Sequence, residues 1–107
     1  LMTLPLLAIG AVGVIGVATH WVGEGIREMV EAFAKGDVSR ARHLNGQLQW
    51  AMRFQTSDAA PNPVPAKAML RALGQPVGHC RPPMGPEPDG LEEEARRLAA
   101  ELHLAAA

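Results

Sequence analysis

Residues 1–18 have the sequence LMTLPLLAIGAVGVIGVA and contain no charged side chain. The first charged residue of either sign is Glu24. About 20 apolar residues are enough to cross a bilayer, so length alone permits a membrane span. An uncharged run at the start of a chain can also be a secretory signal. A third interpretation is a short helix followed by a strand that is buried on both faces.

The order of residues within this run favours the helix and the strand. A signal peptide needs a cationic region first, and no lysine or arginine precedes the run. Leucine and isoleucine predominate before Gly10, and a glycine there suits a helix C-terminus. Residues 12–17 are rich in β-branched side chains without polar alternation, as in strands covered on both sides. We therefore predict a helix over residues 3–10 and a strand over residues 12–18.

Composition restricts the class of protein. With 107 residues the chain is one domain at most. Lysine and arginine total 10 against 11 acidic residues, so no basic block is available to bind a nucleic acid. The single Cys80 excludes an intrachain disulfide and fits a reducing, cytoplasmic compartment. The four histidines are too scattered to share a helix face, so we predict no metal site and no cofactor.

Helical patterns follow the predicted strand. The first begins at Gly23, carries an apolar stripe with the spacing i, i+3, i+4, i+7, and ends at Gly36. Asp37 is the predicted N-cap of the second. The charged residues Glu92 and Arg96, spaced i and i+4, predict a solvated face on the last helix. The later helices are predicted over residues 38–54, residues 66–73 and from about residue 89 onward.

One strand among helices is an unusual inventory. A strand buried on both faces needs neighbouring strands for its N–H and C=O groups, and leaving these groups unpaired is costly. A partner chain or a larger fold must supply them. The order helix, strand, helix is typical of a (β/α) repeat, whose barrel needs about 250 residues. The residues alone therefore predict an α/β class, mostly α within this chain, with the strand belonging to a larger (β/α) fold.

Three segments resemble the dihydrodipicolinate synthase / N-acetylneuraminate lyase family. Residues 4–17, LPLLAIGAVGVIGV, are similar to the family's last helix–strand unit. Residues 61–67, PNPVPAK, are similar to its Asn-Pro-Ile-Pro-Val-Lys segment. Residues 81–86, RPPMGP, resemble its Leu-Pro-Met-x-Pro stretch before the final helix. The order of these motifs, with a Gly-Asp turn between two helices, agrees over nearly the whole chain.

The resemblance implies a class I aldolase or lyase. Members form a (β/α)8 barrel with extra C-terminal helices, assemble as homotetramers, and bind pyruvate as a Schiff base on a barrel lysine. They then join pyruvate to an aldehyde co-substrate, or release it from one. Residues 1–36 would be the last barrel helix, the strand and the following helix. Residues 37–107 would be the C-terminal helical extension.

The resemblance also assigns site residues. The family's Schiff-base lysine lies upstream of this chain, and the chain has no tyrosine for the family's proton relay. Neither Lys35 nor Lys67 stands where a desolvated amine is expected, so we predict no catalytic residue and treat both as solvated cations. Ile15 matches the isoleucine that lines the family's pyruvate site and is the predicted substrate-binding residue. Gly16 and His20 replace the family's usual serine and asparagine, so the aldehyde is left open.

Two other functions remain open from the sequence. The uncharged run would also suit a small helical interaction protein with an N-terminal membrane anchor. The chain could instead be a remnant without function of its own, whose exposed strand edges favour aggregation.

Overall fold

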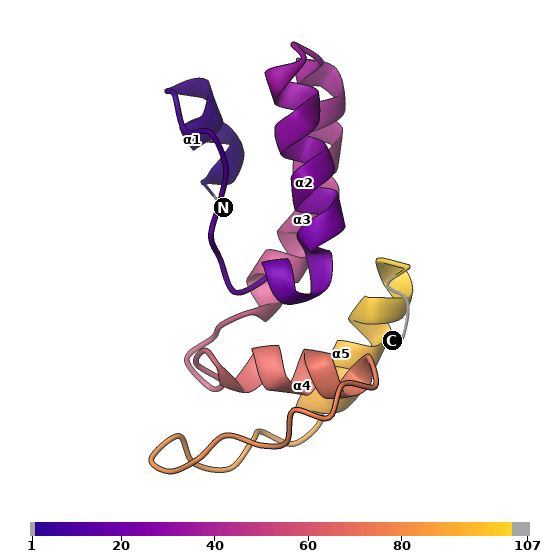
Figure 1. Ribbon diagram of the computed structural model, residues 1–107. Coiled ribbons are helices and arrows are strands. Elements are labelled where there is room, and N and C mark those ends of the chain that lie inside the picture. The colour runs from indigo at the N-terminus through magenta and orange to yellow at the C-terminus, as the bar shows by residue number, and fades with distance from the viewer. Residues whose placement is uncertain (1, 104–107) are drawn as a thin grey trace. The chain divides into compact units, whose positions relative to one another are not determined.

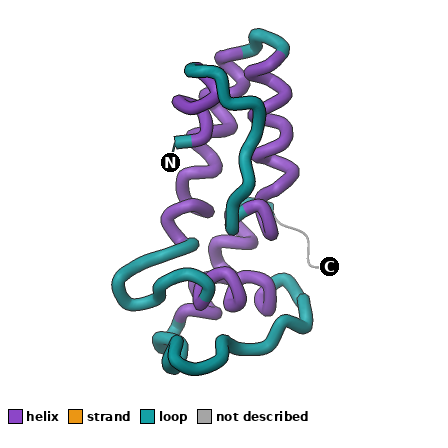
Figure 2. Tube along the Cα trace, turned by 60° about the vertical axis from the view of Figure 1, so that its left-hand side comes forward, coloured by secondary structure: helices purple, strands orange, loops and turns teal. Residues whose placement is uncertain are grey.

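The computed structural model describes residues 2–103 of the chain, and its regular structure there is entirely helical (Figures 1 and 2). The helices in that range are α1 (Thr3–Ala8), α2 (Thr19–Ala34), α3 (Val38–Phe54), α4 (Val64–Ala72) and α5 (Leu91–Glu101). The predicted predominance of helix is therefore confirmed. The bounds of α3 are those expected from the sequence, whereas α2 begins earlier than Gly23, with a kink at Val22.

The predicted strand over residues 12–18 does not form. Residues 11–16 have no regular secondary structure, and Val17 and Ala18 form a turn that leads into α2. The side chains of Val12 and Ile15 are 94% and 105% exposed. A strand exists only through hydrogen bonds to a neighbouring strand, and residues 2–103 contain none. The β-branched residues favour a strand, but the described part of the chain offers no neighbouring strand with which they could pair.

The chain divides into two compact units, unit 1 (Leu1–Met52) and unit 2 (Arg53–Ala107). This division differs from the predicted boundary between residues 36 and 37. The predicted boundary separates the barrel part from the helical extension. It stays a prediction, because the two compact units are not a division into barrel and extension.

Unit 1 is built around the antiparallel pair of α2 and α3, which Figures 1 and 2 show side by side. Leu48 lies so close to Gly25 that a Cβ there would meet its Cδ2 at 3.1 Å, and Arg40 on α3 donates to Glu28 on α2. Met29 is fully buried between them. The other buried apolar side chains of unit 1 are Leu7, Ala18, Trp21, Val22, Ile26, Ala32, Ala41, Leu44, Leu48 and Ala51.

The turn between α2 and α3 has the predicted caps. Gly36 adopts a φ of 82°, which side chains with a Cβ rarely tolerate, and its N–H donates to Phe33 O at 3.0 Å. The Asp37 N–H donates to Ala32 O at 2.9 Å, which completes a Schellman motif. The Asp37 carboxylate then accepts from the Arg40 N–H at 2.9 Å and caps α3.

Replacing Asp37 by alanine should destabilise the chain by about 1 kcal/mol, because the N-terminal amide of α3 loses its acceptor. Urea denaturation followed by circular dichroism measures the difference. The matched control is Asp37→Asn, which keeps an acceptor oxygen and should cost much less. Equal losses in the two variants would contradict the capping role.

Unit 2 is organised by the packing of α4 against α5. Val64 and Pro65 begin α4, where a proline costs nothing because the first amides of a helix lack intrahelical acceptors. Met69 is fully buried. The other buried residues of these two helices are Val64, Pro65, Ala66, Ala68, Leu91, Ala95, Leu98 and Ala99. A connection of residues 73–90, with five prolines, joins α4 to α5.

In the described part of the chain, no helix has both the length and the apolar character that a bilayer crossing requires. Helix α1, which holds the start of the uncharged run, is only 6 residues long.

Candidate functional site

The predicted binding residue, Ile15, lies in the extended segment of residues 11–16 that connects α1 to α2. Gly10 ends α1 with a φ of 107° and redirects the chain into this segment. At the other end, Thr19 begins α2 and its hydroxyl donates to Gly16 O. The Ile15 side chain is fully exposed and contributes nothing to the core of unit 1. Burying the exposed Ile15 side chain against another apolar surface would therefore be favourable.

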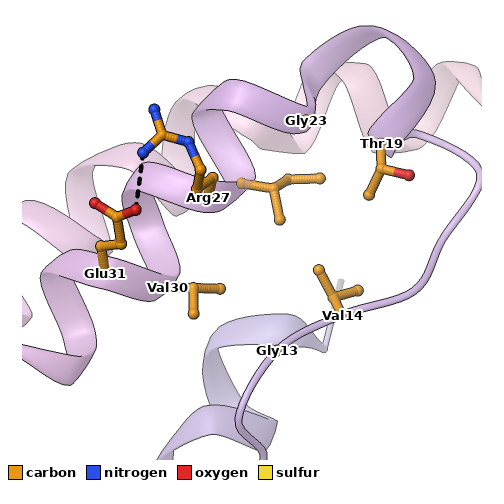
Figure 3. Close-up of a pocket in the computed structure, with 8 residues that line it drawn as sticks. Gly13, Val14, Thr19, Gly23, Arg27, Val30 and Glu31 are labelled. Atoms are coloured by element: carbon orange, nitrogen blue, oxygen red, sulfur yellow. Dashed lines mark hydrogen bonds and ion pairs between the residues drawn. The ribbon is translucent and has the colours of Figure 1, made fainter.

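A hollow of about 400 Å³ lies between this segment and α2 (Figure 3). Val14, which precedes Ile15, points into it from the extended segment, and Val30 on α2 lies opposite. Ile26 of α2 also lines the hollow. Thr19 and Gly23 lie at one end and Arg27 and Glu31 at the other, with Gly13 also lining the hollow. Ile15 itself is not among the residues that line it. The structure thus separates neighbouring residues: Val14 faces α2, and Ile15 does not reach the hollow.

The charged end of the hollow is internally neutralised. Arg27 Nη1 donates to Glu31 at 2.8 Å, and Arg27 Nη2 donates to Glu24 at 2.7 Å. The hydrogen bonds with Glu24 and then with Glu31 raise the pKa of Arg27 further above its ordinary value. Arg27 therefore stays protonated and cannot act as a general acid or base. Its partners occupy its donors, so the hollow suits an apolar side chain better than an anion.

The two lysines of the chain occupy different environments, and neither resembles a Schiff-base amine. Lys35 is 76% exposed and lies 3.9 Å from Glu31, as expected for a solvated cation. Lys67 is half-buried, and its Nζ donates to Val77 O at 3.1 Å and to His79 O at 3.0 Å. The prediction that Lys67 is simply solvated was wrong, because the carbonyls of the following connection turn back onto α4. Its Nζ is thus engaged by two backbone carbonyls and does not line the hollow, unlike an amine presented to a carbonyl substrate.

His20, which replaces the family's usual asparagine, is exposed on α2. Among residues 2–103, no group of three histidine, cysteine, aspartate or glutamate residues could hold a metal ion. Two buried polar atoms, Trp21 Nε1 and Asn45 Oδ1, find no hydrogen-bond partner within the described range. Burying a polar atom without a hydrogen-bond partner costs free energy of folding, so each of these two atoms destabilises the fold until it gains a partner.

One cluster was not anticipated from the sequence. Arg71 on α4 binds Glu87 in the connection and Glu92 on α5, so Glu92 belongs to a partly buried ion-pair network as well as pairing with Arg96. The i, i+4 spacing identified the pair of Glu92 and Arg96 but gave no sign of Arg71, which is 21 residues away in the chain.

Comparisons with known proteins agree with this geometry. A profile of the Dihydrodipicolinate synthetase family matches residues 1–102. The chain is 43% identical over 101 residues to the 4-hydroxy-tetrahydrodipicolinate synthase of Parasynechococcus marenigrum (strain WH8102), covering 94% of this chain and 33% of that protein. It is 45% identical over 97 residues to 4-hydroxy-tetrahydrodipicolinate synthase 1 of Halalkalibacterium halodurans, covering 91% of this chain and 31% of that protein.

A solved structure matches as well. The crystal structure of dihydrodipicolinate synthase from Aquifex aeolicus has a TM-score of 0.84 and 28% sequence identity, covering 98% of this chain and 35% of that one. The fold and the relatives thus define a class of proteins related to dihydrodipicolinate synthase. The chain belongs to the dihydrodipicolinate synthetase family. It spans about a third of the length of the curated relatives it matches.

Proposed function

We propose that this chain is the C-terminal portion of a pyruvate-dependent class I aldolase or lyase, most like 4-hydroxy-tetrahydrodipicolinate synthase. The complete enzyme would condense pyruvate with aspartate semialdehyde. The observation that carries the proposal is the match of residues 1–102 to the family profile, together with relatives of one function at 43% and 45% identity.

The proposed chemistry uses a lysine outside this chain. Its neutral amine adds to the pyruvate carbonyl, and loss of water leaves an imine. Loss of a proton from the pyruvate methyl group then gives an enamine, whose carbon attacks the aldehyde carbonyl. The nucleophile must be a desolvated, uncharged amine. Lys35 is exposed beside Glu31, and Lys67 Nζ donates to two backbone carbonyls, so neither fits that role. The chain by itself is therefore proposed to be inactive.

In this proposal Ile15 lines the pyruvate site and contributes shape without proton chemistry. Residues 12–18 would become the closing strand of the barrel, with residues 1–36 as its last unit and residues 37–107 as the extension. The exposure of Val12 and Ile15 supports this, since both side chains would be covered once neighbouring strands are added. Active sites of such barrels lie at the carboxyl ends of the strands. Ile15 would belong to the closing strand, and His20 would follow its carboxyl end.

The complete protein is further proposed to be a cytoplasmic homotetramer. A single cysteine in the chain supports a reducing compartment. Gel filtration coupled to light scattering, applied to the assembled protein, would measure the number of subunits.

Borohydride reduction in the presence of pyruvate tests where the Schiff base forms. The chain alone should give no covalent adduct by mass spectrometry, because the lysine that forms the Schiff base is proposed to lie outside it. An adduct of the mass of reduced pyruvate on Lys35 or Lys67 would contradict the proposal.

A chimera supplies the positive control. In it, this chain replaces the matching third of the Parasynechococcus marenigrum relative. The chimera should form an adduct on a lysine of the relative's portion and should regain synthase activity. A folded chimera that traps pyruvate there and lacks activity would show that this chain cannot complete the site.

A further inference from the structure

The connection between α4 and α5 is tied to α4 by two cations one helical turn apart. Lys67 Nζ donates to the carbonyl oxygens of Val77 and His79, and Arg71 Nη1 donates to the carbonyl of Gly78 between them at 2.7 Å. Three successive carbonyls of the connection therefore converge on the side chains of Lys67 and Arg71, which are spaced i and i+4 and so share a helix face.

Arg71 also holds the far end of the connection. Its Nη2 donates to Glu87, and its Nε donates to Glu92 in the first turn of α5 at 3.1 Å. The Arg71 and Glu87 side chains are only 14% and 17% exposed. The other oxygen of Glu87 lies 3.1 Å from His79 Nδ1, which closes a ring between the two ends of the connection. Because these charges are partly withdrawn from water, losing one of them leaves its partners without compensation.

The connection buries little apolar surface: Val77, Met84 and Pro88 are only half-buried. Its exposed residues include Gly78, His79 and the stretch 81–83, and none of residues 74–90 belongs to the buried apolar core. Helices α4 and α5, by contrast, bury apolar side chains against each other. Segments with few buried apolar contacts open at a lower free energy than packed helices do. The polar contacts of Lys67 and Arg71 are thus the main restraint on the connection.

We propose that Lys67 and Arg71 form a latch that holds residues 75–88 of the connection against α4. This segment opens as a unit while α4 and α5 stay packed. This inference concerns the internal contacts of unit 2 and holds whatever reaction the complete protein performs. Cys80 reports on the latch, because it is half-buried and directly follows His79, whose carbonyl Lys67 binds.

Alkylation of Cys80 by a maleimide, read by mass spectrometry, tests the proposal. The full chain should be labelled about tenfold faster in Lys67→Gln and faster still in Arg71→Gln, because each loses hydrogen bonds from a charged donor. Lys67→Arg should restore most of the protection, since it keeps the charge and several donors. The helical circular dichroism signal should stay unchanged in Lys67→Gln.

Matched controls come from unit 1. Lys35→Gln makes the same chemical change at the other lysine, and Arg27→Gln removes an arginine that also binds two glutamates. Neither should change the rate at Cys80. An unchanged rate in both latch variants, or an equal rise in the controls, would overturn the proposal.

Hydrogen exchange of the unaltered chain gives a test that needs no substitution. The amides of the connection, of which that of Val77 donates to Gln75 O, should exchange ahead of the amides inside α4 and α5. Exchange of the connection and both helices in a single step would overturn the latch, because the connection would then open only with the whole of unit 2.

Discussion

Replacing Ile15 by aspartate should lower kcat/KM of the active chimera by at least about 100-fold. In the assembled barrel the new carboxylate would lie where an apolar side chain is proposed to line the pyruvate site. Burying an unpaired charge costs several kcal/mol, and each 1.36 kcal/mol is tenfold in rate. A carboxylate there would also repel the carboxylate of pyruvate. Steady-state kinetics of the chimera measures the loss.

The same substitution should leave the isolated chain almost unchanged. Ile15 is fully exposed there, so the free energy of unfolding should change by less than about 0.5 kcal/mol. The matched control in the chimera is Ile15→Val, which keeps an apolar β-branched side chain and should retain most of the activity. Full activity of the aspartate variant would refute the proposed role of Ile15.

Replacing Met69 by alanine should destabilise unit 2 by about 2–5 kcal/mol. Met69 is fully buried on α4, and truncating it removes apolar contacts and leaves a cavity that the helices fill only in part. A loss of this size is a large fraction of the stability of a small domain. Urea denaturation followed by the helical circular dichroism signal measures it.

Met2→Ala is the matched control, because it makes the same chemical change at a methionine that is 62% exposed. Its cost should stay within about 0.5 kcal/mol. Comparable losses in the two variants would mean that Met69 does not contribute to a packed core.

The local signals in the sequence predicted the helices well. Gly36 and Asp37 mark the turn between α2 and α3 in the sequence, and both cap bonds are present in the structure. Such signals act within a few residues, so neighbouring residues suffice to read them. The start of α2 was missed because Thr19 to Val22 form a first, kinked turn that no cap residue announces.

The candidate site was harder to predict. Ile15 was found through family resemblance, and the structure adds that its side chain is exposed and that Val14, its neighbour, faces the hollow instead. The course of the backbone decides whether Val14 or Ile15 faces α2. The sequence does not distinguish them, because both are apolar and β-branched. The environment of Lys67 was missed for a related reason, since its acceptors are backbone carbonyls, which every residue carries.

The sequence by itself determined that the chain is mostly helical, where α3 lies, and which family the chain resembles. These properties follow from spacing, from capping residues and from motifs that can be read along one dimension. Only the tertiary structure decided that residues 11–16 form no strand and that Lys67 and Arg71 hold the connection to α5. Both depend on groups that come together only on folding: a strand requires a neighbouring strand, and a latch requires the loop to return to its helix.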